Sequence, residues 1–184
     1  IHWDDGGGLN SFDYKRSKFE HFKNIQGDDM SISDNTVYCV FHDKDDVVWA
    51  GTANGLNRLN SQLKKFDRYK HSFKDAGSLS NDIVRYIFQD RQGRIWIGTH
   101  DGLNLYNKES QQFRRYKNDP NDPKSLSDNS IRGIYQDHEN RIWIATFAGG
   151  LNILKNASIG TFENFSHDVA DPNSIGSNDV WCIF

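Results

Sequence analysis

The sequence has little of what marks a disulfide-rich, membrane-spanning or nucleic-acid-binding protein. Its two cysteines, Cys39 and Cys182, are too few for a disulfide framework, and we expect both to be small buried side chains. The longest apolar runs, such as residues 95–97, are far shorter than the roughly 20 residues that cross a bilayer. The net charge is -3, with 22 Lys and Arg scattered among 25 Asp and Glu. No basic field is therefore available for phosphates, and we expect no nucleic-acid partner.

The usual signatures of catalysis and cofactor binding are also missing. There is no Gly-rich phosphate loop, no His-Glu-x-x-His, no cysteine cluster and no nucleophile elbow. The 7 histidines are spread over predicted turns and strand ends without the spacing of metal ligands. We therefore predict no catalytic residue, no metal site and no cofactor in this chain. The first residues lack the character of a signal peptide, and composition leaves the compartment open.

What the sequence does have is an internal repeat. Trp49, Trp96 and Trp143 follow one another at intervals of 47 residues, and a Gly-Leu-Asn triplet accompanies each of them. Fixed periods of this size are typical of solenoids and propellers. The chain starts and stops within a repeat. Its predicted units are a partial blade 1–30, full blades 31–77, 78–124 and 125–173, and the start of the next blade at 174–184.

Each full unit contains short strand-like runs rich in β-branched and aromatic residues, separated by turn residues. In the second unit four such runs are expected, at residues 83–89, 94–99, 103–107 and 112–117. The first hairpin ends in Gly, Asn or Asp, the residue types that tolerate a left-handed backbone.

The second run of each unit is apolar or small on both faces. Ile95 and Ile97 lie on one face, and Trp96 and Gly98 on the other. Neither face can be left in water, so the sheets must stack. We predict an all-β protein, a β-propeller of four-stranded antiparallel blades with almost no helix. Its core comprises the three repeated tryptophans and the fourth-strand pairs Phe66 and Tyr69, Phe113 and Tyr116, and Phe162 and Phe165.

The repeated text has a recognisable form. Asp90-x-x-Gly93-x-x-Trp96-Ile97-Gly98-Thr99-x-x-Gly102-Leu103-Asn104, preceded by Ser78-Leu79-Ser80-Asn81, closely resembles the two-component regulator propeller repeat, and the resemblance extends over essentially the whole chain. It implies a periplasmic sensor module of histidine kinases and hybrid two-component systems of the Bacteroides type. In that family the signals are often oligosaccharides, and the kinase lies elsewhere in the full-length protein. This sequence departs from the pattern at Asp46, which replaces the turn glycine, and at an extra residue in Gly149-Gly150.

The number of repeats bears on association. The resemblance implies about seven blades, whereas this chain holds nearly four. Either it is part of a larger propeller, or its terminal strands pair with each other or with a second copy. An incomplete propeller exposes an apolar sheet face and a strand edge. We therefore expect the isolated chain to self-associate.

Alignment of the units suggests a ligand site on one face of the propeller. Equivalent positions early in the innermost strand carry large, polar-tipped side chains, and the loop before Gly-Leu-Asn adds further ones. Aromatic faces can stack on sugar rings, and arginine can hold hydroxyls or carboxylates. We predict contacts with a small ligand, most plausibly an oligosaccharide, and the two arginines favour an acidic one. The predicted residues are Tyr38, Arg85, Arg132, Trp181, His100, Asp101 and Phe147.

Two kinds of alternative stay open. The arginines can instead be structural, paired with the loop of the adjacent blade. At the level of function, the rivals of a sensor module are a protein–protein interaction scaffold and a propeller lyase or hydrolase. An enzyme would need acid–base groups that converge on the axis, and only His100 with Asp101 comes near this.

Overall fold

The computed structural model describes residues 2–4 and 6–183. Every regular element in this part of the chain is a β-strand, and each sheet is antiparallel with its strands in sequence order. The first sheet is partial and contains β1 (His2–Asp4), β2 (Gly8–Asp13) and β3 (Lys18–Phe22). Three full blades follow. The first blade is β4 (Val37–His42), β5 (Val48–Thr52), β6 (Gly55–Asn60) and β7 (Lys65–Tyr69); the second is β8 (Val84–Gln89), β9 (Ile95–Thr99), β10 (Gly102–Asn107) and β11 (Gln112–Tyr116); the third is β12 (Ile131–Gln136), β13 (Ile142–Thr146), β14 (Leu151–Asn156) and β15 (Thr161–Phe165).

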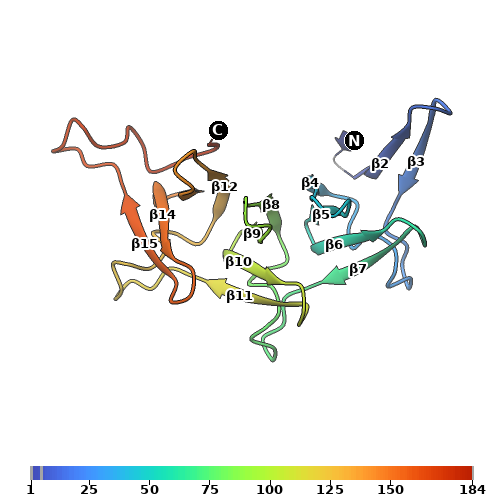
Figure 1. Ribbon diagram of the computed structural model, residues 1–184, viewed down its shortest axis with the longest axis horizontal. Helices are drawn as coiled ribbons and strands as arrows, with labels where there is room; N and C mark the ends of the chain where they lie inside the picture. Colours follow the sequence, from blue (N-terminus) through green and yellow to red (C-terminus); the bar gives the residue numbers. More distant parts are fainter. Residues whose placement is uncertain (1, 5, 184) are drawn as a thin grey trace.

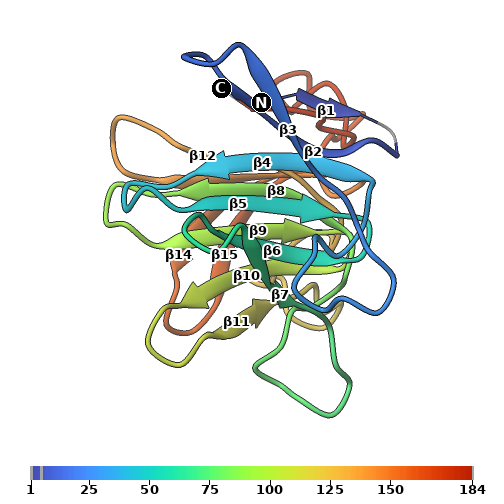
Figure 2. The same ribbon diagram turned by 90° about the vertical axis from the view of Figure 1, so that its right-hand side faces the viewer.

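The sheets follow one another around an arc, with both chain ends on its open side (Figure 1). The innermost strands β4, β8 and β12 line the inside of the arc, where β8 contacts both of its neighbours. The outermost strands β7, β11 and β15 lie on the periphery (Figure 1). In the side view, β4 and β8 run alongside each other (Figure 2). This is a β-propeller of four-stranded antiparallel blades, as the repeat predicts.

The strand positions expected for the second unit agree with β8 to β11 to within one residue at each end. At the other end of the chain, residues 166–183 form no strand. The backbone N–H of Val180 nevertheless donates to the carbonyl of Thr146, at 3.1 Å, which ties this segment to the third blade. No described helix has the length and apolarity of a membrane span.

A buried aspartate and a tryptophan fix the first hairpin of every blade. In the second blade the Asp90 carboxylate accepts from the backbone N–H groups of Gln92 and Arg94, and from Nε1 of Trp96 at 2.9 Å. Asp43 and Asp137 hold the indoles of their own blades in the same way. Because a buried indole N–H needs an acceptor, the carboxylate at the turn sets the orientation of the ring that packs between blades.

A second repeated anchor joins one blade to the next. The Asn104 side chain is fully buried and bonds both the backbone and the hydroxyl of Ser80, at 2.9 and 2.8 Å. Two residues earlier, the N–H of Gly102 donates to the carbonyl of Asn129 in the loop that leads into the third blade, at 2.7 Å. Gly102 has a φ of 123°, and an added Cβ would lie 2.9 Å from the carbonyl oxygen of Tyr116. The Gly-Leu-Asn triplet therefore bonds each blade to the loop that leads into the next one.

The core lies between blades, and the structure corrects five of the expected burials. Trp49 and Trp96 are fully buried, with 1% and 0% exposed, as predicted. Trp143 is only half-buried, because no further sheet among the described residues packs on the third blade. For the same reason Cys182 is exposed rather than buried, whereas Cys39 is half-buried against the second blade. The fourth-strand phenylalanines Phe66, Phe113 and Phe162 are buried, as is Tyr116, while Tyr69 and Phe165 are half-buried.

Candidate functional site

The innermost strands share a bulge at the position that the sequence alignment singles out. The β4–β5 register shifts between Val37 and Cys39, so that Tyr38 is the extra residue. The same shift leaves Arg85 as the extra residue in β8 and Arg132 in β12. A bulge releases its residue from the ladder and re-aims the side chain. The sequence predicts the position of these residues, but it gives no sign of the bulge that presents them.

Each bulge arginine stacks on aromatic rings. The guanidinium carbon of Arg85 lies 4.2 Å from the ring centroid of Tyr38, which belongs to the preceding blade. The guanidinium of Arg132 lies 4.8 Å from the Phe147 ring and also 4.8 Å from the Trp181 ring. These distances are well within the range of a cation–π contact. We call these five residues the axial array: Tyr38, Arg85, Arg132, Phe147 and Trp181.

The two arginines of the axial array have no carboxylate partner among the described residues. The Nε atoms of Arg85 and Arg132 are buried, and neither makes a hydrogen bond within the part of the chain that the structure describes. Most buried polar atoms in proteins are bonded, and an unbonded one costs about 1–3 kcal/mol. Within the described residues, the contacts of these two arginines are therefore with aromatic rings rather than with a carboxylate of an adjacent loop.

The two other predicted site residues lie outside the axial array. His100 is exposed on the β9–β10 loop, and its backbone N–H donates to the carbonyl of Ile83 at 3.0 Å. Phe147 occupies the equivalent place in the third blade, where its N–H bonds Ser130. The Asp101 carboxylate forms an ion pair with Lys117 at 2.7 Å. Within the described residues, neither His100 nor Asp101 bonds an arginine of the axial array.

Comparison with known proteins identifies the sequence repeat that positions these residues. The family model for the two component regulator propeller matches residues 31–54, 78–101 and 125–148. Each match runs from the loop before an innermost strand, through the bulge and the Asp–Trp hairpin, to the loop after the second strand. Each of the three full blades thus contains a segment that matches the two component regulator propeller repeat.

Solved structures share the fold of this propeller. One is the extracellular domain of the hybrid two component system BT4673 from B. thetaiotaomicron, with a TM-score of 0.78 and 24% identity over 97% of this chain and 22% of that one. Another structure of that extracellular domain, described as a one component system, gives a TM-score of 0.75, 23% identity and the same coverages. Virginiamycin B lyase from Staphylococcus aureus gives a TM-score of 0.61 and 15% identity over 90% of this chain and 50% of the lyase. This chain thus spans about a fifth of the extracellular domain that it resembles. A search of curated proteins found no match.

The residues that follow the bulge positions, next to the axial array, are electrically neutral. Burial raises the pKa of the Cys39 thiol to about 12, against a smaller lowering by the hydrogen bond from the Gly51 backbone. Burial also raises the pKa of Tyr86, which holds the equivalent position in the second blade. Gly133 holds it in the third. Because these groups stay uncharged at neutral pH, the axial arginines gain no counter-charge from the residues next to them.

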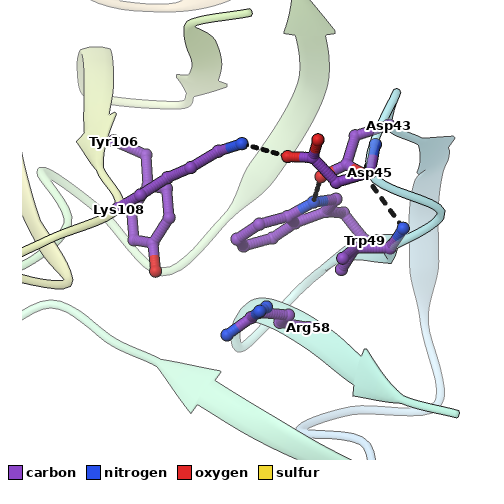
Figure 3. Close-up of a pocket in the computed structure, with 7 residues that line it drawn as sticks. Asp43, Asp45, Trp49, Arg58, Tyr106 and Lys108 are labelled. Atoms are coloured by element: carbon purple, nitrogen blue, oxygen red, sulfur yellow. Dashed lines mark hydrogen bonds and ion pairs between the residues drawn. The ribbon is translucent and has the colours of Figure 1, made fainter.

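A second candidate site is a pocket of about 100 Å³ in the seam between the first and second blades. Figure 3 shows Asp43, Asp45 and Trp49 on one side of this pocket, with Tyr106 and Lys108 opposite them and Arg58 below. Lys108 forms an ion pair with Asp45 across the seam. The hydrogen bond and the charge of Lys108 hold the pKa of Asp45 below its usual range. We call this the seam pocket. No group of three or more possible metal ligands lies in the described part of the chain.

Proposed function

We propose that this chain is a ligand-binding part of the extracytoplasmic sensor of a two-component signalling protein. Two findings support the proposal: the regulator propeller repeats, and the shared fold with the extracellular domain of a hybrid two component system. The proposal places the propeller on the outer side of a membrane, where it meets small molecules before a kinase elsewhere in the protein does.

Within the sensor we assign ligand contact to the axial array. The observation that carries this assignment is the pair of buried, unbonded Nε atoms on Arg85 and Arg132. Each guanidinium lies over an aromatic ring, a contact that restricts its motion before a ligand arrives. A preorganised cation loses less freedom on binding than a mobile one. Because the Nε atoms are buried, a ligand would meet the terminal N–H groups of the two guanidiniums, for which the described residues supply no hydrogen-bond acceptor.

The chemistry of the axial array fits an oligosaccharide with acidic groups. Trp181 is 64% exposed and Phe147 is 44% exposed, so both rings offer a face on which a sugar can stack. The two guanidiniums offer forked donors that match a carboxylate or sulfate. His100 and Asp101 lie on the adjoining loop and take the outer part of the same ligand in this proposal.

Two other functions have weaker support. A propeller lyase shares the fold, but a likeness at 15% identity carries no activity, and the axial array contains no acid–base pair. In this proposal the chain is therefore not an enzyme. An interaction scaffold would bury the exposed rings of Phe147 and Trp181 against another protein, and it would need no anion at the arginines.

Calorimetric titration of the full-length sensor region tests the proposal. Oligogalacturonides serve as acidic probes, and neutral galactose oligomers of equal length serve as the comparison. We expect Arg85→Gln and Arg132→Gln to weaken the acidic probe by about tenfold or more each, the value of one charge-assisted hydrogen bond, and the neutral probe much less. Phe147→Ala should weaken both probes alike. Arg114→Gln, on the periphery at β11, is the matched control. Unchanged affinity for either probe in all three array variants, with the fold retained, would refute the assignment.

A further inference from the structure

The buried aspartate of the first hairpin has a different set of partners in one blade. In the second blade Oδ2 of Asp90 accepts from Nε1 of Trp96 at 2.9 Å and from Nε of Arg94 at 2.6 Å. The third blade repeats this pair of bonds with Trp143 and Arg141, at 2.8 and 2.6 Å. In the first blade Val47 occupies the place of the arginine.

The arginine in the other two blades also stacks on the indole. The guanidinium carbon of Arg94 lies 5.3 Å from the centroid of the Trp96 ring, and that of Arg141 lies 5.4 Å from the Trp143 ring. One guanidinium therefore bonds the carboxylate and covers the aromatic face at the same time. Because this arrangement occurs in two blades, it shows that the aspartate and tryptophan of a blade together hold one guanidinium group.

In the first blade the Asp43 carboxylate keeps its indole partner but has no cation. Oδ2 of Asp43 accepts from Nε1 of Trp49 at 2.9 Å, and none of the ion pairs in the described part of the chain includes Asp43. The guanidinium carbon of Arg58 lies 6.0 Å from the centroid of the Trp49 ring, and Arg58 forms its ion pair with Asp67, at 3.9 Å. Asp43 is only 5% exposed. Its other oxygen, Oδ1, accepts from the backbone N–H groups of Asp45 and Val47, both at 2.9 Å. The carboxylates of the other two blades accept the same three bonds and an arginine in addition, so Asp43 differs from them only in lacking the cation.

The seam pocket lies at the place that the arginine fills in the other blades. Asp43, Val47 and Trp49 all line it, and its volume is about 100 Å³. This is roughly three times the volume that one water occupies in the liquid, so the pocket has room for a small planar group. Of the four charged side chains in its wall, Asp45 and Lys108 neutralise each other at the rim (Figure 3). Arg58 leans toward Asp67, which leaves the charge of Asp43 to be matched.

We propose that the seam pocket binds a guanidinium group, in the pose that Arg94 and Arg141 adopt in the neighbouring blades. The group donates to Oδ2 of Asp43 and lies beside the Trp49 ring, near Arg58, whose guanidinium carbon is 6.0 Å from the ring centroid. It comes either from a small alkylguanidine or from an arginine side chain of a peptide, since both present the same chemistry.

The indole N–H resonances of the tryptophans test this proposal with internal controls. N-methylguanidine and N-acetyl-arginine amide are the two probes, and n-butylammonium is the control cation. With millimolar guanidine probe, we expect the Nε1–H signal of Trp49 to shift until binding saturates. The signals of Trp96 and Trp143 should stay in place. Binding of the small probe alone would assign the ligand to a metabolite, and binding of both would admit a peptide arginine.

Variants copied from the sister blade sharpen the test. Val47→Arg with Arg58→Leu reproduces the Arg94 and Leu105 of the second blade, and it should weaken the probe at Trp49 by at least about tenfold, the loss expected for one charge-assisted hydrogen bond. Arg58→Leu alone keeps the pocket and removes a competing cation, so it should retain binding. Arg94→Val should make the Trp96 signal respond to the probe.

Three results would overturn the proposal. The first is an unresponsive Trp49 signal with wild-type protein at millimolar probe. The second is an equal shift of all three indoles, which would indicate general solvation by a denaturant-like cation. The third is an equal response to n-butylammonium, because a point-charge ammonium cannot reproduce the planar contact that the two arginines make.

Discussion

Replacing Trp96 and Trp143 by alanine, one at a time, measures how much the packing of a neighbouring blade adds to the stability that the repeated tryptophan contributes. The two side chains occupy the same place in adjacent blades, and each donates to the aspartate of its own hairpin, at 2.9 and 2.8 Å. Each also carries an arginine on its ring. They differ in burial, because Trp96 is enclosed between two blades and Trp143 is half-buried.

The expected loss follows from the area that each indole removes from water. A fully buried tryptophan covers about 150–250 Å², and at about 25 cal/mol per Å² this amounts to roughly 4–6 kcal/mol as an upper estimate. Tryptophan-to-alanine changes in cores cost about 3–5 kcal/mol. We expect Trp96→Ala to fall in that range. Trp143→Ala should cost about half as much, roughly 2 kcal/mol, because solvent already reaches part of the ring.

Urea denaturation followed by circular dichroism at several protein concentrations measures the two free energies of unfolding. The concentration series is needed because association would add to the apparent stability. Trp49→Ala provides the control, since Trp49 is 1% exposed and should match Trp96 rather than Trp143. Equal losses for Trp96→Ala and Trp143→Ala, or a loss below about 1 kcal/mol at Trp96, would refute the argument from burial.

Three further predictions concern the thiols, acid stability and association. At pH 8, iodoacetamide should label exposed Cys182 first and spare Cys39, whose pKa burial raises to about 12, and equal labelling rates would contradict that burial. Burial would raise the pKa of Asp137, but the bonds from Trp143 and Arg141 outweigh it and hold the pKa well below the ordinary value. The ionised carboxylate therefore stabilises the fold above the unfolded-state pKa, and this stability is lost as pH falls through the lower folded-state value. Urea melts between pH 6 and pH 2 should show a shallower decline for Asp137→Asn than for wild type, and parallel declines would contradict this. Light scattering at micromolar concentration should give a mass above 21.2 kDa, because the partly open third blade leaves apolar surface for a second copy, and a monomeric mass would contradict this.

The strands of this protein could be predicted closely because their limits are set by local signals. The hairpin that starts at Asp90 and reaches a left-handed Gly93 is encoded within a few residues, and β8 and β9 lie on either side of it. The burial of Trp143 and Cys182 could not be predicted in the same way. Burial depends on the sheet that packs against a residue, and that sheet is absent beside the third blade among the described residues.

For the axial array too, the sequence predicts the positions of the residues but not the contacts that they make. Alignment places Tyr38, Arg85 and Arg132 in one slot, because position along a repeat is a property of the sequence. The bulge at that slot depends on the pairing register between two strands, which the side-chain pattern does not specify. Alignment also cannot show that Arg132 stacks on Phe147, whereas His100 makes no such bond to Arg85.

The aspartate–tryptophan bond marks what sequence reasoning missed and how it could have been found. The spacing of Asp90 and Trp96 is the same in all three blades, and a buried indole N–H needs an acceptor. That requirement would have assigned the turn carboxylate a second role beyond turn formation. It would then have made Val47 conspicuous, since the other two blades place an arginine where it can bond that carboxylate. A repeat protein thus carries its own comparison, and a blade that lacks a partner its sisters possess indicates where an outside group can bind.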